Sequence, residues 1–584
     1  TGGTANVVVG TEWKTYVLDF SGKDLDVDGK KVDFSRIKSL LFNFAPGMMY
    51  KGTFWIDDLK VGTDADVKAA PPPIEIHTPL QITLAPGGSI GDEFVITGSS
   101  DTDIVELSGL DTNLLSQSAV TKAGDRLKLD LQARPDAAGI NRLKIKVIDQ
   151  QDRQIEKTLD IIIPKLEEPA IIDIDPATRF QTIDGFGTFL GSQVWDAAKQ
   201  ELTLPLVKDL GISIARFGII DTDFEPRNDN ANPDVIDFNG YDPSALPLEW
   251  MRRLKEESQV DKYIVTVWSP PAWMKKSRTL SASSSSGENY LEERYYEEYA
   301  EYLVALVRIV KEYTDIDLYA ISVQNEPQFN EPYPSALLPA DKMAQLLKVV
   351  AIRFQNEGIR TKLYMPEALP QQKGIKEYIR QLDLVPEASQ YTDIIAIHNY
   401  DPDGIHVGGA GAQEWAEMAE WANAARPRQL WMTETSGHPN TWSGAVMLFG
   451  NIYNALVYGK ASAWIWWTLS ESAAGEVYGL VVDNQPTARY IVSRHVYRAA
   501  QPGAVRIMTH SETNLLSLAF VNPDGTIALV LYNPGSARWV SCMGAGELEE
   551  GWFSQDRYFN RPVQRIGDAM LLPADSVATL IFRP

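Results

Sequence analysis

The 584-residue sequence has one cysteine, no long apolar run and no excess of basic residues. The single Cys542 excludes an intrachain disulfide framework and any zinc or iron–sulfur site built from several cysteines. Since no run of about 18 apolar residues occurs, the sequence predicts no membrane insertion. The net charge of −24 argues against general binding to nucleic acid or anionic membranes, because both require a basic face.

The apolar content is sufficient for several large cores. Hydrophobic residues make up 44% of the chain, which is ordinary for a folded protein. At roughly 100–200 residues per domain, the length predicts three or four domains. The residue pattern divides the chain into a partial jelly-roll, carbohydrate-binding-like segment at 1–65, an immunoglobulin-like β-sandwich at 74–165, a barrel at 170–495 and a C-terminal β-sandwich at 496–584.

Both N-terminal segments are predicted to be β-rich. Trp13–Phe20 and Gly52–Val61 alternate apolar and polar residues, which is typical of antiparallel strands, and they resemble the closing half of jelly-roll carbohydrate-binding modules. Pro71–Pro73 marks a linker, because consecutive prolines cannot continue a strand ladder. Strand patterns such as Arg142–Ile148 follow it, with no cluster of catalytic residues, so this second segment is interpreted as a spacer.

The third region alternates short apolar strands with long amphipathic helices, which predicts βα units and a parallel sheet. Eight such units over roughly 300 residues favour a (β/α)8 TIM barrel. No nucleotide-binding glycine loop follows any strand, so we expect no cofactor. The segment at about 170–180 is predicted to add a strand to the C-terminal sandwich. The eight predicted barrel strands are Ile183–Phe189, Ile212–Ile219, Tyr263–Trp268, Leu318–Val323, Lys362–Met365, Asp393–Tyr400, Gln429–Thr433 and Ala461–Thr468.

Two glutamates close predicted barrel strands. Glu326 ends the fourth strand region and Glu434 ends the seventh. Reacting groups of such barrels come from the carboxyl ends of the strands, so both side chains are expected at one barrel face. A carboxyl pair there is what retaining glycoside hydrolysis requires, with one group as proton donor and the other as nucleophile. A third acid, Glu367, is interpreted as a supporting or subsite residue.

Several segments, in order and spacing, resemble successive motifs of glycoside hydrolase family 30 and its clan A relatives. The resemblance covers roughly residues 170–584 and implies a retaining mechanism, with Glu326 as acid/base and Glu434 as nucleophile. It also implies a side β-sandwich built from both ends of the catalytic region. It does not fix the substrate, since family members cut glucans, xylans, galactans, fucosides and glycolipids. The matching segments are Gln181–Gly187, Trp268–Met274, Ile321–Pro327, Trp431–Glu434 and Arg494–Gly503.

Substrate-binding residues are predicted from polar and aromatic side chains at the same strand ends. Amide, guanidinium and imidazole groups there can bind sugar oxygens or orient the glutamates, and indole rings can stack on pyranose faces. We expect Trp268 and one of Trp466 or Trp467 to face the substrate. The histidines lack ligand spacing on one element, so no catalytic metal is expected. The predicted substrate-binding residues are Asn325, Arg216, Trp268, His398, Tyr400, Trp466 and Trp467.

The substrate and mode of action stay open between alternatives. The loop Ser470–Tyr478 offers no base before Arg489, which disfavours glucuronoxylan. Long loops at Phe224–Tyr241, Ser277–Tyr290 and Phe329–Pro339 suit the walls of a cleft, so the preferred reading is an endo-acting retaining β-glycosidase for a β-glucan, xylan or galactan. An agarase- or porphyranase-type galactan hydrolase is one alternative, and a noncatalytic carbohydrate-binding protein is another.

The expected partner is therefore a polysaccharide or oligosaccharide, with no nucleic acid and no membrane. The chain begins at Thr1 without an initiator Met or an apolar leader, which is compatible with a processed or truncated product. A secreted, cell-surface or periplasmic location is expected. The sequence predicts no oligomeric state.

Overall fold

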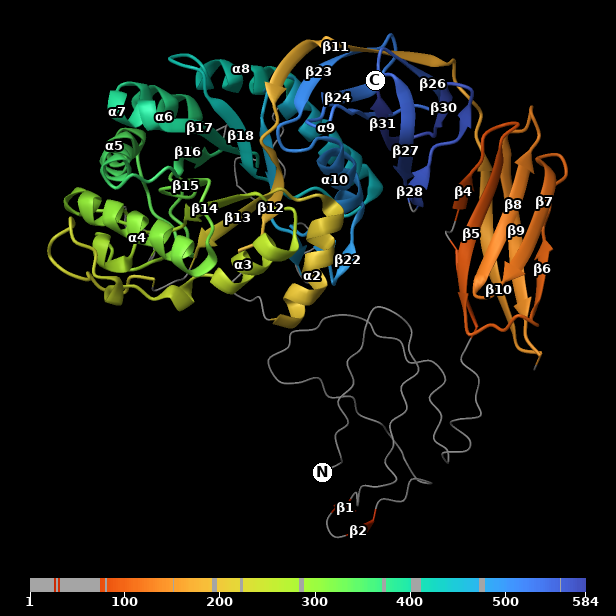
Figure 1. The fold of residues 1–584 in the computed structure, drawn as a ribbon, viewed down its shortest axis with the longest axis horizontal. Helices are drawn as coiled ribbons and strands as arrows, with labels where there is room; N and C mark the ends of the chain where they lie inside the picture. The colour runs from red at the N-terminus through yellow and green to blue at the C-terminus, as the bar shows by residue number, and fades with distance from the viewer. Residues whose placement is uncertain are drawn as a thin grey trace. The chain divides into compact units, whose positions relative to one another are not determined.

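The chain forms two compact units, Thr1–Ile163 and Pro164–Pro584. The computed structural model describes residues 26–27, 30–31, 74–78, 81–150, 152–191, 197–220, 224–282, 288–369, 374–400, 411–471, 478–556 and 558–584 (Figure 1). Apart from the short strands β1 (Asp26–Val27) and β2 (Lys30–Lys31), the predicted carbohydrate-binding-like segment lies outside the described residues. Among the helices of the described ranges, none has the length and apolarity needed to cross a membrane.

The first unit contains two four-stranded sheets. Burial alternates along the longer strands, so that Leu143, Ile145 and Val147 are buried while Arg142 and Lys144, which precede Leu143 and Ile145, are exposed. This period of two places one face of the strand on an apolar core and the other in solvent. In sheet order the strands are β4 (Gln81–Thr83), β10 (Gln154–Ile163), β9 (Gly139–Ile148) and β6 (Ile104–Ser108), then β3 (Glu75–His77), β5 (Ser89–Thr97), β8 (Arg126–Ala133) and β7 (Leu115–Ala123).

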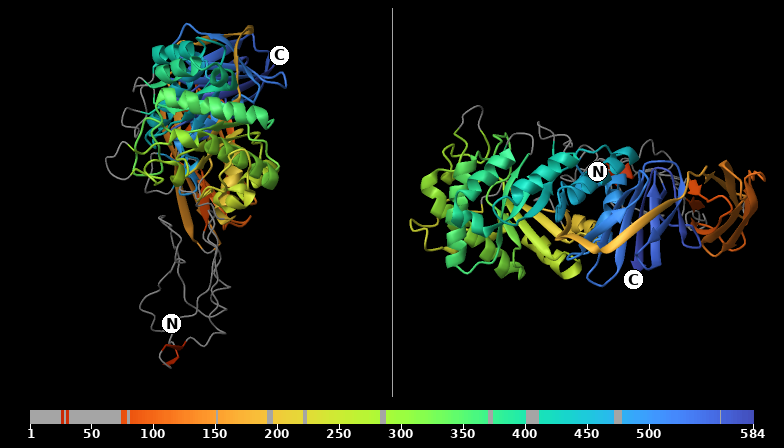
Figure 2. Two further views of the ribbon diagram at one scale, coloured as in Figure 1. Left: turned by 90° about the vertical axis from the view of Figure 1, so that its left-hand side faces the viewer. Right: turned by 90° about the horizontal axis from the view of Figure 1, so that it is seen from above.

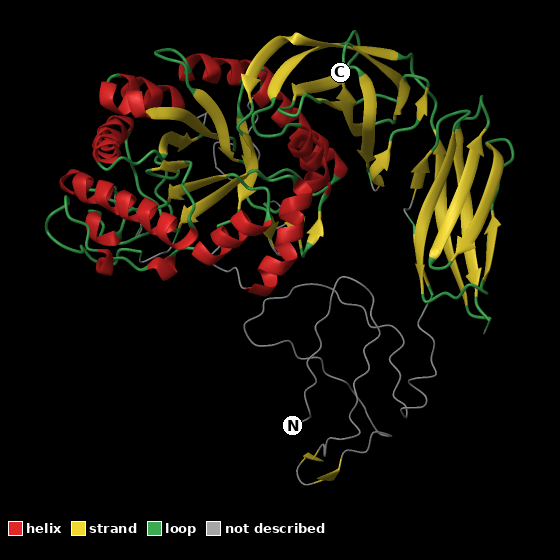
Figure 3. Cartoon of the chain, in the orientation of Figure 1, coloured by secondary structure: helices red, strands yellow, loops and turns green. Residues whose placement is uncertain are grey.

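Eight parallel strands of the second unit close into a barrel, and all eight predicted barrel strands are confirmed. Their buried, apolar sequences suit a parallel sheet that is covered on both faces, with the helices outside (Figure 3). The strands are β12 (Gly185–Phe189), β13 (Ile214–Ile219), β14 (Lys262–Val267), β15 (Ala320–Ser322), β16 (Lys362–Ala368), β17 (Thr392–His398), β18 (Gln429–Glu434) and β19 (Ala463–Trp466).

The barrel has two apolar cores. A small cluster that includes Ile214, Tyr364 and Trp431 gathers from strands around the barrel, and a much larger cluster joins the strands to the helices. Packing on both sides fixes where each strand ends and therefore where its last side chains lie. The helices are α2 (Ala197–Leu210), α3 (Leu248–Glu257), α4 (Tyr296–Thr314), α5 (Ala340–Asn356), α6 (Gly374–Asp383), α7 (Pro386–Tyr391), α8 (Ala412–Ala422), α9 (Trp442–Val457) and α10 (Ala488–Ala499).

A ten-stranded sheet completes the second unit and confirms the predicted C-terminal β-sandwich. Strand β11, which precedes the barrel, lies inside this sheet, antiparallel to β23 and parallel to β26 (Figure 2). Both ends of the unit therefore build one sheet. The strands are β11 (Ala170–Thr182), β23 (Val505–His510), β24 (Leu516–Val521), β25 (Ile527–Asn533), β26 (Arg538–Met543), β27 (Glu547–Gln555), β28 (Tyr558–Pro562), β29 (Arg565–Ile566), β30 (Ala569–Leu572) and β31 (Ser576–Arg583).

Candidate active site

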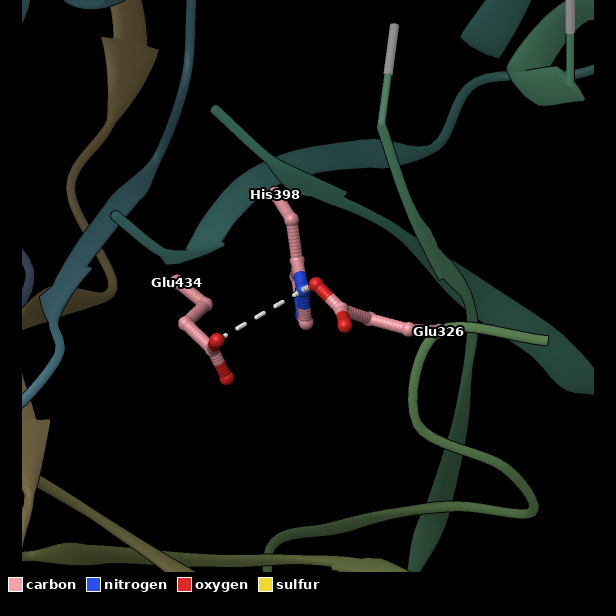
Figure 4. A group of neighbouring side chains, drawn as sticks. All are labelled: Glu326, His398 and Glu434. Atoms are coloured by element: carbon pink, nitrogen blue, oxygen red, sulfur yellow. Dashed lines mark hydrogen bonds and ion pairs between the residues drawn. The ribbon is translucent and has the colours of Figure 1, made fainter. Parts of the chain in front are cut away.

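The structure brings Glu326 and Glu434 together at the carboxyl ends of the barrel strands. Glu434 is the last residue of β18, and Glu326 follows β15. Three atoms lie within 4.8 Å of one another: one carboxylate oxygen of Glu326, one of Glu434 and a ring nitrogen of His398. Figure 4 shows the two carboxyl groups arriving from opposite sides and meeting beside the histidine. The two acids can therefore act on the two sides of one bond.

Arg216 on β13 joins the acids into a network. Its guanidinium donates to Glu434 Oε2 at 2.5 Å, to Glu367 Oε1 at 3.1 Å and to Asn325 Oδ1 at 3.0 Å. Its Nε donates to Thr266 Oγ1 at 3.2 Å. The side chain is completely buried, so it is shielded from solvent and salt and its attraction to the carboxylates is strong.

His398, the last residue of β17, is the second cation of the site. Its Nδ1 lies 3.0 Å from Glu326 Oε1 and 3.9 Å from Glu434 Oε1, and its Nε2 lies 3.5 Å from Glu367 Oε1. Complete burial by itself would lower the pKa of His398. The charge of Glu434 and the contacts with Glu326 and Glu367 outweigh burial and raise this pKa to about 9. The imidazole is therefore an imidazolium at neutral pH.

The charges of the cluster do not balance. Burial opposes ionisation of Glu367, but Arg216 and then His398 lower its pKa below the ordinary value. Burial raises the pKa of Glu434, and the charge of Glu326 adds to the rise, while His398 and Arg216 oppose it. The negative charge of Glu367 offsets one of the two positive charges of Arg216 and His398. One positive charge therefore remains for the two carboxyl groups of Glu326 and Glu434. The ionisation of Glu434 therefore depends on the charge of the neighbouring Glu326.

Two of the acids sit on unusual backbone. Glu326 has φ 41° and Glu367 has φ 54°, in the left-handed region that residues with a side chain rarely adopt. The two turns support each other, because the Glu326 N–H donates to the Glu367 carbonyl at 3.1 Å. Such backbone costs about 1–3 kcal/mol per residue and is concentrated at functional sites. Glu367 therefore supports Glu326 through its backbone, and it contacts Arg216 and His398 through its side chain.

Tyr400, Trp268 and Trp467 also lie at this site. The Tyr400 hydroxyl is 3.3 Å from Glu434 Oε1. The Trp268 ring lies 4.9 Å from the Arg216 guanidinium carbon, and its centroid is 5.7 Å from that of Trp467. Because Trp467 is only half-buried, part of its ring is available to a ligand, whereas Trp268 is buried and mainly braces Arg216.

Trp466 is a correction to the predicted substrate-binding set. Its side chain is completely buried in the large core between strands and helices, where its Nε1 donates to the Tyr478 carbonyl. Consecutive side chains of a strand point to opposite faces. Ala463 and Ile465 of β19 belong to the cluster inside the barrel, so Trp466 faces the helices, and the prediction that Trp466 binds substrate is wrong.

Tyr333 was missed by sequence reasoning. It lies in the loop that follows β15, and 44% of its surface is exposed. Partial burial, followed by the charges of Glu326, Glu331 and Glu434, raises the pKa of its hydroxyl. The charges of both central acids therefore act on the Tyr333 hydroxyl. The only signal in the sequence is an aromatic residue in a polar, proline-rich loop, which is too common to single it out.

A metal ion is a poor fit to the central acids. One atom each from Glu326, His398 and Glu434 lie close enough to share an ion. The surrounding carboxylates, however, outweigh burial and keep His398 protonated up to a pKa of about 9, and an imidazolium has no lone pair to give a metal. Arg216 already occupies Glu434 Oε2. The donor chemistry thus favours proton transfer over metal binding.

Comparison with known proteins agrees with this geometry. The model described as "Glycosyl hydrolase family 30 beta sandwich domain" matches residues 503–547. The glucuronoxylanase XynC of Bacillus subtilis (strain 168) is 25% identical over 335 residues, which cover 54% of this chain and 72% of that protein. The chain is similar to glycoside hydrolase family 30. The resemblance predicted from its motifs is thus confirmed, and the relatives indicate a glycoside hydrolase.

Solved structures support the family 30-like fold. The catalytic domain of a family 30 xylanase C from Talaromyces cellulolyticus has a TM-score of 0.59 and 21% identity, covering 71% of this chain and all of that chain. An endo-β-1,6-glucanase has a TM-score of 0.54 and 22% identity, covering 71% of this chain and 94% of that chain. Both cover the greater part of this chain in a single match.

Proposed function

We propose that the protein is a secreted, retaining endo-β-glycoside hydrolase that acts on a polysaccharide by double displacement. The observation that carries this proposal is the approach of a Glu326 and a Glu434 carboxylate oxygen to within 4.8 Å. Retaining enzymes hold their carboxyl groups about 5–5.5 Å apart, whereas inverting enzymes need about 6.5–9.5 Å to admit a water. The separation here leaves room for the anomeric carbon and for direct attack on it.

Glu434 is the proposed nucleophile. Arg216 binds its Oε2 and the Tyr400 hydroxyl contacts its Oε1, so its orientation is fixed before substrate arrives. Arg216 and His398 favour its ionised form against the effect of burial on its pKa. Attack by this carboxylate on the anomeric carbon forms a glycosyl-enzyme and breaks the bond to the leaving oxygen.

Glu326 is the proposed acid/base. Its side chain is 12% exposed, in contrast to the fully buried Glu367, so it can exchange protons with solvent. It gives a proton to the leaving oxygen and later takes one from the water that hydrolyses the glycosyl-enzyme. Once Glu434 is esterified it no longer carries charge, so it no longer repels the Glu326 carboxylate in its second role.

Asn325 and Trp467 are proposed to bind the sugar next to the bond that is cut. Asn325 Oδ1 accepts from Arg216, which directs the amide nitrogen of Asn325 to serve as a donor. A hydrogen bond from this group to the sugar 2-hydroxyl would strengthen in the transition state. The half-buried Trp467 ring supplies an apolar face for the pyranose C–H groups.

The proposed substrate is a neutral β-linked glucan, xylan or galactan backbone. The relatives are named for glucuronoxylan, xylan and β-1,6-glucan, all β-linked polysaccharides. Arg489, the first base after the eighth strand, is completely buried and donates to the carbonyls of His438 and Gly479, so it is not presented to a glucuronate. Residues 472–477 of the preceding loop lie outside the described residues.

A polysaccharide panel tests the proposal. Xylan, glucuronoxylan, β-1,3-, β-1,4- and β-1,6-glucans, galactan, agarose and porphyran are incubated with wild type, Glu326→Gln and Glu434→Gln, and product lengths are measured over time. We expect one neutral β-glucan, xylan or galactan to be cut into mixed short oligomers. Both variants should lose at least about 10²-fold in kcat.

Glu377→Gln is the control, because Glu377 is an exposed acid on α6 that pairs with Arg380. It should leave kcat within twofold of wild type. Cleavage restricted to agarose or porphyran would favour the marine galactan hydrolase. Binding of a polysaccharide without cleavage would favour the noncatalytic alternative. Equal activity of both glutamate variants and wild type would contradict the proposed mechanism.

A further inference from the structure

A second group of acids lies in the barrel unit, apart from the central glutamates. Glu225 and Asp229 belong to the loop after β13, and Glu298 and Glu301 lie one turn apart on α4. One carboxylate oxygen each from Asp229, Glu298 and Glu301 lie within 4.8 Å of one another. Glu225 is close enough for the charges of Asp229, Glu301 and Glu298, after burial, to raise its pKa to about 9.

These carboxylates are buried and incompletely paired. Glu301 is 1% exposed and Glu225 is 3% exposed. Within the described ranges, one oxygen of each of the four acids is shielded from solvent and has no hydrogen-bond partner: Glu225 Oε2, Asp229 Oδ1, Glu298 Oε2 and Glu301 Oε1. A buried, unsatisfied carboxylate oxygen is costly unless a proton or a cation meets it.

Tyr241 provides an independent indication that a ligand belongs here. Its side chain is 5% exposed, and its hydroxyl has no hydrogen-bond partner among the described residues. Burial and then the charges of all four acids raise its pKa, which places the hydroxyl beside the group. A phenol surrounded by carboxylates would normally donate a hydrogen bond to one of them. Here its hydroxyl, like one oxygen of each of the four acids, is shielded from solvent and has no hydrogen-bond partner among the described residues.

Basic side chains of the described residues do not neutralise these four acids. Arg353 lowers the pKa of Glu301, while its Nη1 contacts the carbonyl of Pro233 at 2.7 Å and Asp234 at 3.2 Å, and its Nε lies 3.0 Å from Glu357. The positive charge of one arginine is therefore set against the possible negative charges of four acids.

We propose that Glu225, Asp229, Glu298 and Glu301, with the hydroxyl of Tyr241, form a binding site for one calcium ion. The donor set consists only of oxygen atoms, which hard cations prefer, and Ca²⁺ takes 6–8 oxygens at about 2.3–2.6 Å. Asp229, Glu298 and Glu301 each offer one oxygen, and these oxygens lie within 4.8 Å of one another, close enough to share one ion. Mg²⁺ is disfavoured because it retains several waters and demands a smaller octahedral shell.

The site would join a loop to a helix beside the active-site strands. The loop is closed by a hydrogen bond from Asp242 N to the Phe224 carbonyl at 2.8 Å. Its Glu225 carbonyl accepts from Trp273 Nε1 at 3.1 Å, and Trp273 belongs to the segment that follows β14. Calcium would replace repulsion between the loop and α4 by attraction, and so hold this segment in place.

Calcium binding to the full chain, stripped of metal with a chelator, is the test. Isothermal titration with CaCl2 should give one site per chain, and added calcium should raise the melting temperature. Glu301→Gln and Asp229→Asn should each weaken binding at least tenfold. Asp229 is only partly buried, so its variant is expected to fold even if the Glu301 variant does not. Glu297→Gln, an exposed neighbour on α4, should bind within twofold of wild type.

The proposal is overturned if metal-stripped wild type binds no calcium at millimolar concentration, since the four acids would then share protons. It is also overturned if Asp229→Asn binds as tightly as wild type, or if Mg²⁺ displaces Ca²⁺ at equal concentration. All of these readouts are made without a sugar substrate. They therefore succeed or fail independently of the proposed hydrolase activity.

Discussion

Arg216 connects three residues of the active site, because its guanidinium contacts Glu434, Glu367 and Asn325 while fully buried. Removing it leaves two buried carboxylates without their cation. We expect Arg216→Ala to lower the free energy of unfolding by about 3–5 kcal/mol, measured by chemical denaturation. Arg252→Ala should cost less than about 1 kcal/mol, because the pairs of Arg252 with Glu249 and Glu256 are solvent-exposed. Equal losses in the two variants would contradict the network.

His398 makes stability depend on pH. Its pKa is raised to about 9 in the folded protein by Glu434, Glu326 and Glu367, which outweigh burial, from about 6.5 in an unfolded chain. The stabilisation is therefore complete below pH 6.5 and is lost as the pH rises through 9. We expect wild type to exceed His398→Gln by about 3 kcal/mol near pH 6, with the gap closing above pH 9.

His495→Gln is the matched control for this titration. Burial and then Arg494 lower the pKa of His495 to about 3, and its ring bonds to Thr579 and Ser554 as a neutral group. Between pH 7.5 and 10 the gap between wild type and this variant should be constant. A constant gap for His398→Gln over the same range would show that His398 is not charged in the folded protein.

At the scale of residues, sequence reasoning located groups whose position follows from strand direction. Glu326, Glu434 and His398 lie at or near the ends of predicted strands, which the barrel brings together, and Arg216 lies within the second predicted strand. The direction of the Trp466 side chain could not be predicted without the strand register. The environment of Tyr333 depends on the fold of a loop, which no sequence pattern predicts. The coupling of Glu367 to both cations likewise depends on distances that sequence spacing does not give.

At the scale of elements, the eight barrel strands were predictable because short apolar runs alternated with long amphipathic helices. The ends of these strands were harder to predict. Strand β15 spans only Ala320–Ser322, and β16 extends to Ala368, beyond the predicted end at Met365. A register shift between Ile397 and His398 pairs His398 with Glu434 in the neighbouring strand. Such an irregularity re-aims a side chain, and it leaves no periodic signal in the sequence.

The loop after β15 is expected to contribute to substrate binding through Tyr333. Because the ring is exposed and the charges of both central acids act on its hydroxyl, Tyr333→Ala should raise KM several-fold on the best polysaccharide with little change in kcat. Tyr333→Phe keeps the ring and should restore most of the affinity. Tyr313→Ala removes a comparably exposed tyrosine from α4 and should change neither constant. A fall in kcat without a change in KM would contradict a binding role.

At the scale of the whole molecule, the two compact units predict that the second one folds by itself. A fragment Pro164–Pro584 keeps β11 within the ten-stranded sheet and every residue of the proposed active site. We expect its kcat on a soluble oligosaccharide to stay within twofold of the full chain.

A fragment that begins at Ile183 is the matched comparison. It removes β11 and leaves β23 and β26 without the strand that lies between them. Unpaired strand edges favour aggregation, so this fragment should be insoluble. If it proved soluble and active, β11 would not be an integral part of the unit.

The stereochemistry of the first product tests the central claim most directly. Proton NMR of a fresh digest of the cleaved polysaccharide follows the anomeric signals before mutarotation equilibrates them. Carboxylate oxygens within 4.8 Å predict a covalent glycosyl-enzyme on Glu434, and therefore the β-anomer should appear first and the α-anomer only later. Initial release of the α-anomer would mean direct attack by water and would contradict the account.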